Sequence, residues 1–291
     1  MPAESLQVGT RTVLAAIVLN IDPILLQLGP LAIRWYGLMY VVGIIVGVQA
    51  ALPYARSLGI TDDQVWSVLG PCIVAGLVGG RLYYVVQQPL GPFIAQPWRI
   101  IATWEGGMAF YGAIGAVFLT LWYMCRREKI PFWRMLDAAA IFAAVGQAFG
   151  RIGNIINGDI LGAPTSLPWG VIYVNGNSFA PSHSIAYQPA AAYELICDLI
   201  LIAVLFTLRH RLKTSGLLAT IYFIGYALTQ FLVFFLRDSE PVVGFGLKQA
   251  QLTSIVVFLI ALAIGTYRLR SGETPVEHVP APATSSMSES T

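Results

Sequence analysis

Charged residues are scarce in this chain. Asp, Glu, Lys and Arg together make up 11% of its 291 residues, while 56% of the residues are hydrophobic. An ordinary soluble domain carries about 25% charged residues, so this composition excludes that class and predicts a membrane protein. The formal net charge is +2, and no basic run with interleaved aromatic residues supports binding to nucleic acid.

Cysteine and histidine are also rare, with three of each. Cys72, Cys125 and Cys197 lie far apart in apolar runs and form no CxxC pair. Packing in the interior therefore explains them better than a disulfide framework or a metal site. No histidine lies inside an apolar run. We expect neither a metal ion nor a cofactor.

Long apolar runs, in contrast, are abundant. Runs of about 20 apolar residues are typical of helices that cross a membrane. The chain holds seven, at roughly 34–54, 64–86, 107–125, 135–150, 190–208, 215–236 and 248–267. We predict an all-α polytopic membrane protein with about seven transmembrane helices. No internal repeat is visible, which leaves the inverted-repeat architecture of many transporters without support.

The basic residues predict the orientation of these helices. Four alternate inter-helix segments lie on one side of the membrane and hold ten of the 17 basic residues: Arg56; Arg126, Arg127, Lys129 and Arg134; Arg209, Arg211 and Lys213; Arg268 and Arg270. The positive-inside rule makes that side cytoplasmic. The N-terminus is then predicted outside and the C-terminus inside.

Three longer segments, 87–106, 151–189 and 237–247, fall on the outer side in this topology. The segment 151–189 is rich in Gly, Pro, Asn and Ser and contains the strand-like "WGVIYV", so we predict a small extracytoplasmic cap. Residues 1–270 are expected to form the membrane domain. The Pro-, Ser- and Thr-rich residues 271–291 are expected to form a disordered cytoplasmic tail.

Two polar groups lie near the predicted outer ends of the first two helices. In "RWYGLMY", Tyr36 and Tyr40 are four residues apart and share a face beside Arg34. An aromatic belt with a snorkelling arginine explains this spacing as well as a ligand site does. In "GLVGGRLYYV", Arg81 follows glycines that allow close helix packing. It either snorkels outward or belongs to a site.

A third segment, "WEGGMAFYGAIGA" at 104–116, opens the third predicted helix. Its small residues indicate close packing against neighbouring helices or against a ligand. Tyr111 places a hydroxyl at membrane depth. A core tyrosine with a satisfied hydroxyl and a site residue are both compatible with this position.

The fourth segment, "GRIGNIINGD" at 150–159, is the richest in polar groups. If the fourth helix continues into it, Arg151 and Asn154 lie at i and i+3 on one face. A guanidinium binds phosphate oxygens bidentately, an amide beside it adds donors, and Gly153 leaves room for a head group. An arginine near hydrocarbon is costly without an anionic partner. We therefore predict a polar cavity that opens outward and binds an anionic lipid head group.

Three acids in or near the spans, Asp137, Glu194 and Asp198, are candidate counter-ions for the arginines. Ion pairs of this kind are structural in some membrane proteins and mark a polar cavity in others.

These segments resemble the prolipoprotein diacylglyceryl transferases of bacterial inner membranes. "GRIGNIINGDILG" is similar to that family's signature, G-R-x-G-N-F-x-N-G-E-x-x-G, with Asp159 in place of the usual glutamate. "RWYGLMY", "GGRLYYV", "WEGGMAFYGA" and "YQPAAAYE" resemble further family segments in the same order. The resemblance covers roughly residues 20 to 270.

The resemblance implies a multi-pass enzyme of the bacterial cytoplasmic membrane. Such an enzyme moves the diacylglyceryl group of phosphatidylglycerol to the lipobox cysteine thiol of prolipoprotein signal peptides and releases glycerol phosphate, the first step of lipoprotein maturation. The implied partners are therefore phosphatidylglycerol, these signal peptides and membrane lipid, and no nucleic acid.

The resemblance also implies roles for individual residues. Arg151 holds the lipid phosphate beside Asn154, and Tyr36 lines the site. Arg237 guards a side opening, while Glu194 and Asp137 support the polar network. The candidate catalytic residues are Arg151, Tyr111 and Tyr36. The candidate substrate-binding residues are Arg151, Asn154, Asn157, Gly153, Asp159, Gly162, Arg81, Glu194, Arg237, Tyr226, Gln230 and Asp137.

Besides Asp159, the chain departs from the family pattern at four positions: Tyr111, Gln188, Gln230 and Phe234. Gln188 replaces the histidine of a His-Pro pair that precedes Tyr193 and Glu194. Tyr111 stands where the family usually has a histidine, and Gln230 and Phe234 stand where it has an arginine and an acid. A tyrosine with a pKa near 10 is a poor base at neutral pH, although it can orient a head group. The leading hypothesis is an active transferase with a variant base arrangement. The alternative is a homologue that binds anionic phospholipid without catalysis, or that uses another acceptor.

Overall fold

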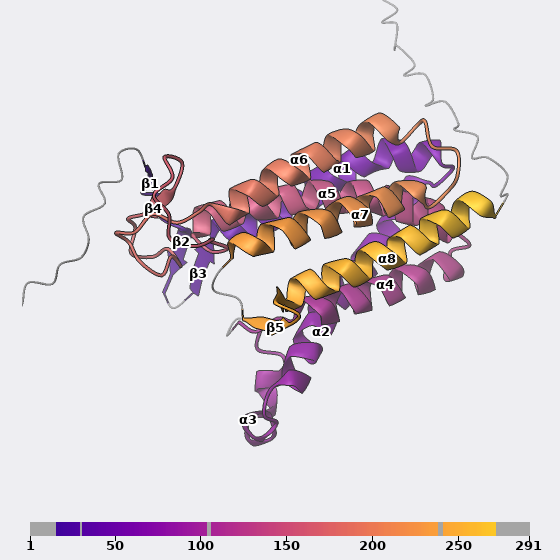
Figure 1. The fold of residues 1–291 in the computed structure, drawn as a ribbon. Helices are drawn as coiled ribbons and strands as arrows, with labels where there is room; N and C mark the ends of the chain where they lie inside the picture. The colour runs from indigo at the N-terminus through magenta and orange to yellow at the C-terminus, as the bar shows by residue number, and fades with distance from the viewer. Residues whose placement is uncertain (1–15, 30, 104–105, 238–240, 272–291) are drawn as a thin grey trace, which may run out of the picture. The chain divides into compact units, whose positions relative to one another are not determined.

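Long α-helices make up most of the structure, a computed structural model that describes residues 16–29, 31–103, 106–237 and 241–271 (Figure 1). The long helices among the described residues are α1 (Trp35–Ser57), α2 (Asp62–Gln87), α4 (Phe110–Arg127), α5 (Phe132–Asn157), α6 (Ala190–Leu208), α7 (Leu217–Val233) and α8 (Gln249–Arg270). Six of them are long and apolar enough to cross a membrane. One of the six, α7, is extended by the 3-10 helix η3 (Phe234–Leu236). The chain is therefore a polytopic α-helical membrane protein.

The seventh long helix, α4, has 18 residues and carries Arg126 and Arg127 in its last turn. These charges explain why it falls outside the set of six. It occupies the place of the third predicted span, so the prediction of about seven spans agrees with the fold.

The fourth predicted span, 135–150, is too short. α5 continues to Asn157 and ends where Gly158 adopts a φ of +74°, a left-handed conformation that glycine adopts without strain. The polar residues after Gly150 suggested a helix end, but other parts of the protein satisfy them, so the helix continues. The segment between α5 and α6 therefore covers residues 158–189, and Arg151 and Asn154 do share a helical face.

The helices divide between two compact units. The first contains the described residues of Met1–Ala50 and Ala140–Glu273, and the second contains Ala51–Ala139. The predicted tail over 271–291 lies outside the described residues except for Ser271, and so do residues 104 and 105, the first two of "WEGGMAFYGAIGA".

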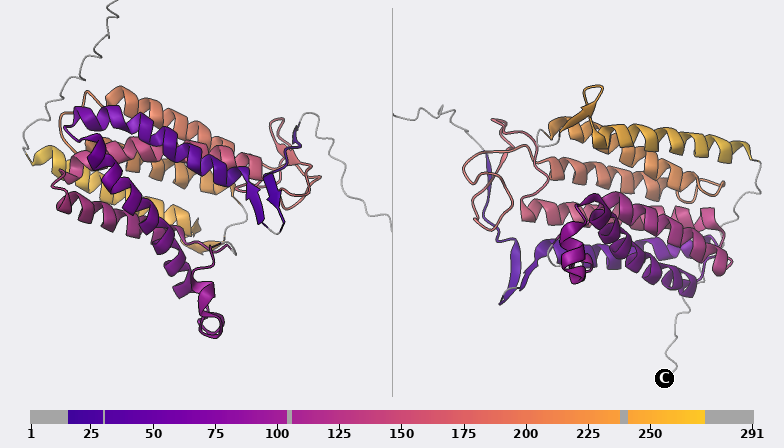
Figure 2. Two further views of the ribbon diagram at one scale, coloured as in Figure 1. Left: turned by 180° about the vertical axis from the view of Figure 1, so that it is seen from behind. Right: turned by 90° about the horizontal axis from the view of Figure 1, so that it is seen from below.

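Close helix contacts in the first unit occur at glycines. α6, α7 and α8 run side by side with the C-terminal part of α5 (Figures 1 and 2). A Cβ on Gly225 of α7 would meet Leu201 of α6 at 2.7 Å, and one on Gly265 of α8 would meet Thr220 of α7 at 2.7 Å. These glycines let neighbouring backbones approach closely, as small residues do in membrane bundles.

The first unit also contains three small sheets. β1 (Ile17–Leu19) pairs in parallel with β4 (Val171–Tyr173), which confirms the strand predicted in "WGVIYV". β2 (Ile24–Leu28) and β3 (Leu31–Arg34) form a hairpin that leads directly into α1. β5 (Val242–Gly244) and β6 (Leu247–Lys248) form a second hairpin before α8. β1, β4 and the loops around them form the small cap at the end of the unit where α5 ends and α6 begins (Figure 1).

The second unit is built on the close packing of α2 against α4. A Cβ on Gly79 of α2 would lie 2.7 Å from the carbonyl oxygen of Gly112 in α4. The connection between the two helices contains the short α3 (Gly91–Ala95) and the 3-10 helix η1 (Pro97–Ile100). α2 itself begins with a capping box formed by Thr61 and Gln64, which satisfies backbone donors at its first turn.

Candidate functional site

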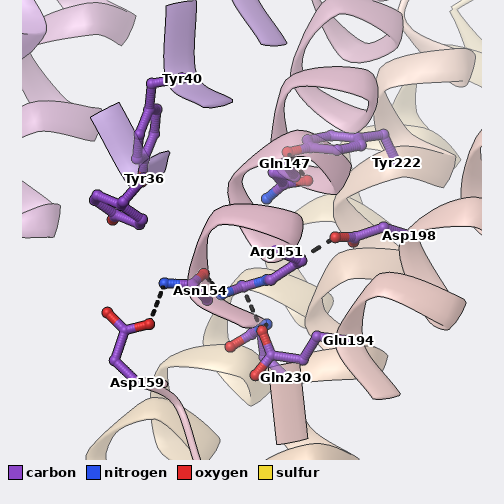
Figure 3. Close-up of polar contacts among 10 residues, drawn as sticks. All are labelled: Tyr36, Tyr40, Gln147, Arg151, Asn154, Asp159, Glu194, Asp198, Tyr222 and Gln230. Carbon is purple, nitrogen blue, oxygen red and sulfur yellow. Dashed lines mark hydrogen bonds and ion pairs between the residues drawn. The ribbon is translucent and has the colours of Figure 1, made fainter. Parts of the chain in front are cut away.

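Polar side chains from three helices of the first unit face one another near the cap (Figure 3). α5 contributes Gln147, Arg151 and Asn154; α6 contributes Glu194 and Asp198; α7 contributes Tyr222 and Gln230. Each set recurs at three, four or eight residues, which places its members on one helical face. The three faces together form a polar seam inside an apolar bundle.

Arg151 is the centre of this seam. Its Nη2 lies 2.5 Å from Glu194 Oε2, and its Nη1 lies 3.5 Å from Asn154 Oδ1. The Arg151 side chain is 15% exposed and the Glu194 side chain 1%. Gln230 Nε2 donates to the same Glu194 oxygen at 3.3 Å. A buried arginine thus has an acidic partner, as its depth in a membrane protein requires.

A chain of hydrogen bonds runs from Arg151 to the cap through Asp159. Asn154 Nδ2 donates to Asp159 Oδ1 at 3.0 Å, and Asn157 Nδ2 donates to Asp159 Oδ2 at 3.1 Å. Asn157 Oδ1 in turn accepts from Arg34 Nη1 at 3.0 Å. Each carboxylate oxygen of Asp159 therefore fixes one amide, and the amides connect the two arginines.

Arg34 does not snorkel as an isolated side chain. Its Nη1 also donates to the carbonyl oxygen of Asn177 in the cap at 3.2 Å, and its guanidinium lies 4.0 Å from the centre of the Phe179 ring. The start of α1 is thereby attached to the cap. This attachment explains Arg34 better than an interfacial aromatic belt does.

Tyr36 lies at the edge of this network. Its hydroxyl is 2.8 Å from that of Tyr40, and the two rings meet edge to face. A Cβ on Gly153 would meet the Tyr36 ring at 3.1 Å and Met39 Cβ at 3.3 Å. Gly153 therefore gives α1 room to approach α5. The space beside Gly153, where we expected a head group, is filled by Tyr36.

Gln147 and Tyr222 extend the seam deeper into the bundle, and the sequence analysis did not identify them. The Tyr222 hydroxyl donates to Gln147 Oε1 at 3.0 Å, and the Tyr222 ring stacks on that of Tyr226 with centroids 6.2 Å apart. The signal was present in the spacing, because Gln147 precedes Arg151 by one helical turn. Tyr226, a predicted binding residue, thus lies beside the seam.

Gly162 and Arg237 lie close together beyond the ends of the helices. A Cβ on Gly162 would come within 2.8 Å of the Leu236 carbonyl oxygen, and the Gly162 amide donates to Gln188. The Arg237 guanidinium lies over the Phe234 ring at 4.5 Å. Lys248 Nζ donates to the carbonyl oxygens of Phe234 and Arg237. These contacts attach the end of α7 both to the cap and to the start of α8.

Three predicted site residues, Arg81, Tyr111 and Asp137, belong to the second unit. Arg81 is 5% exposed and donates to backbone carbonyl oxygens: Nε to Ile100 at 2.9 Å, Nη2 to Arg99 at 2.5 Å, and Nη1 to Gly106 and Gly107. Four backbone acceptors leave Arg81 little donor capacity, so in the structure it organises the loop before α4. Asp137 is 2% exposed, while Tyr111 is 42% exposed.

Chemically, the seam combines one cation with carboxylates and hydrogen-bonding amides. It offers a guanidinium and two carboxamides held by carboxylates. Arg151 is six residues from the end of α5, about 9 Å at the α-helical rise. Among the described residues, no group of three or more His, Cys, Asp or Glu side chains is arranged to hold a metal ion.

Comparison with known proteins identifies the family. The model of the family described as prolipoprotein diacylglyceryl transferase matches residues 23–267. A phosphatidylglycerol–prolipoprotein diacylglyceryl transferase of Geobacter sulfurreducens is 34% identical over 251 residues, covering 84% of this chain and 94% of that protein. The proteins of the same name from Sinorhizobium medicae and Desulfotalea psychrophila are 36% and 35% identical, covering 84% and 86% of this chain and 89% and 94% of theirs. The chain therefore belongs to the prolipoprotein diacylglyceryl transferase family.

Proposed function

We propose that this protein transfers the diacylglyceryl group of phosphatidylglycerol to the cysteine thiol of a prolipoprotein. The new bond joins sulfur to the glyceryl carbon, and the bond from that carbon to the phosphate oxygen breaks. Glycerol phosphate leaves, and the thiol proton passes to a base. Family membership supports the reaction, and the buried Arg151 between α5 and α6 is the observation that carries its assignment to this site.

Arg151 is suited to the phosphate because its position is fixed before any ligand binds. Glu194 holds one end of the guanidinium, and Gln230 holds Glu194. Donors fixed in this way stabilise the negative charge that develops on a leaving phosphate without rearranging during the reaction. Asn154, held by Asp159, adds an amide beside the guanidinium.

The acceptor and the cellular setting form part of the same proposal. We propose that the acceptor is the lipobox of a signal peptide and that the enzyme lies in the bacterial inner membrane with the cap outside and the C-terminus in the cytoplasm. Residues 1–270 act as one transferase domain. The role of Tyr111 stays a prediction of the resemblance, and Tyr111→Phe is expected to weaken transfer without abolishing it.

The test uses purified protein in detergent micelles that contain phosphatidylglycerol and a lipobox peptide. Mass spectrometry should show the peptide gaining one diacylglyceryl group while glycerol phosphate is released. Arg151→Lys keeps the charge but not the bidentate fork, and should lower the rate at least tenfold. Arg56→Lys is the matched control, because Arg56 forms an exposed pair with Asp62, and it should leave the rate unchanged.

Two results would contradict the proposal. Full activity of Arg151→Lys and of Arg151→Ala would show that Arg151 does not bind the phosphate. No transfer by the wild-type protein, with phosphatidylglycerol still bound, would favour the lipid-binding homologue and make Gln230 and Phe234 the residues to revert.

A further inference from the structure

Asp198 is a buried acid for which the proposed reaction has no use so far. It lies on α6 one helical turn after Glu194 and is 3% exposed. Its Oδ2 is 4.0 Å from Arg151 Nε, and neither of these two buried atoms has a hydrogen-bond partner among the described residues. Figure 3 shows Asp198 and Glu194 approaching Arg151 from the same helix.

The two carboxyl groups meet the same edge of the guanidinium. Nε and Nη2 form one edge of its planar fork, and Nη1 and Nη2 form the other. Glu194 takes Nη2, and Asp198 faces Nε. Nη1 is thereby directed toward Asn154, where the contact is a long 3.5 Å. The side chains of α6 thus leave one end of the fork for a ligand.

We propose that Asp198 is a positioning residue that fixes the rotation of the Arg151 guanidinium so that Nη1 faces the phosphate. Glu194 alone contacts one nitrogen, and a single ion pair permits the planar group to pivot about it. A second carboxyl group 4.0 Å from Nε opposes that rotation through charge attraction. The inference rests on the proposed function, because it assigns Asp198 to the same phosphate site.

The charge balance separates this role from a structural one. Two carboxyl groups of α6 face one guanidinium, although a single carboxylate would be enough to neutralise it. Burying more carboxylate charge than the partner can neutralise costs free energy. Retaining Asp198 therefore does not stabilise the fold, and replacing it with an isosteric neutral side chain should not destabilise the protein.

The test is Asp198→Asn in the micelle assay, with phosphatidylglycerol titrated to separate kcat from KM. A misdirected donor affects the transition state more than ground-state binding. We expect kcat to fall by roughly 10- to 100-fold while KM for phosphatidylglycerol changes less than about threefold. The midpoint of thermal unfolding should stay equal or rise. Asp198→Glu, which keeps the carboxyl group, should recover part of the rate.

Asp63→Asn is the matched control, because the exposed Asp63 lies in the first turn of α2, and it should leave kcat unchanged. A kcat for Asp198→Asn within twofold of the wild type would overturn the inference. So would a parallel fall in kcat and in the unfolding midpoint, which indicates a structural role. Wild-type protein without transfer would instead overturn the proposed function itself.

Discussion

At the scale of single residues, the site depends on carboxylates that fix amides and a guanidinium. Asp159 illustrates this arrangement, since its two oxygens accept from Asn154 and Asn157. A neutral amide at this position offers one acceptor where two are needed. It would leave the side-chain amide of Asn154 or of Asn157 without its acceptor.

We therefore expect Asp159→Asn to lower the transfer rate about tenfold or more, since losing a hydrogen bond to a charged group costs about 1.5–3 kcal/mol. The measurement is peptide lipidation followed by mass spectrometry. Asp22→Asn is a suitable control, because the exposed Asp22 also accepts from the side-chain amide of an asparagine, Asn177. Equal rates for Asp159→Asn and the wild type would contradict a role for the Asp159 network.

Tyr173 in β4 provides a prediction about pH. Burial, with a smaller contribution from Asp159, raises its pKa to about 12, and its hydroxyl donates to the Ile155 carbonyl oxygen in the last turn of α5. The neutral tyrosine is the form that the fold favours. Its stabilisation is therefore complete below pH 10 and is lost as the pH rises through 12.

Thermal unfolding in detergent should show this loss directly. Tyr173→Phe should be less stable than the wild type by about 1 kcal/mol at pH 8, and the difference should shrink between pH 10 and pH 12. A difference that stays constant across this range would mean that the hydroxyl does not titrate as described.

At the scale of elements, the sequence predicted helix positions well but missed where α5 ends. Apolar length located six spans to within a few residues, because hydrocarbon thickness sets the length of a spanning helix. The polar residues after Gly150 broke that pattern, and a single sequence does not show that Glu194 lies opposite Arg151. The pairing of β1 with β4 was hidden for the same reason, since their partners lie about 150 residues apart in the chain.

The packing of α2 on α4 gives a prediction at this scale. A side chain at Gly79 would collide with Ala116 and the Gly112 backbone, whereas no atom of the described residues lies within 4 Å of a Cβ on Gly115. Gly79→Ala should destabilise the protein by about 1–3 kcal/mol through overpacking. Gly115→Ala makes the same change on α4 and should be neutral or stabilising, because alanine favours a helix over glycine. Thermal unfolding of the two variants in detergent compares them directly.

At the scale of the whole molecule, the distribution of basic residues predicts the topology, and the packing of the helices brings the site residues together. Composition alone identified a membrane protein, and "GRIGNIINGD" identified Arg151 and Asn154. The carbonyl partners of Arg81 could not be predicted, because backbone acceptors have no signature in a sequence. Asp198 was recognised as a possible counter-ion, but its alignment with Nε is a property of the packed helices.

Cysteine labelling tests the orientation. With Cys72, Cys125 and Cys197 replaced, a cysteine at Asn175 in the cap should react with an impermeant maleimide in spheroplasts. A cysteine at Lys129, in the loop between α4 and α5, should react only after the membrane is opened. Mass spectrometry of the labelled protein gives the result, and the reverse pattern would invert the proposed topology.

The pairing of Arg151 with Glu194 also has a consequence for biosynthesis. Arg151 precedes Glu194 by 43 residues in the chain. At about 5–20 residues per second, the ribosome adds Glu194 roughly 2–9 s after it adds Arg151. Until α6 emerges, α5 carries an arginine whose acidic partner has not been made. Inserting such a residue costs up to about 2.5–3.5 kcal/mol, the value at a helix centre. We expect the last two turns of α5 to wait at the membrane surface and to enter only when α6 arrives, so that insertion and assembly of the site are one event.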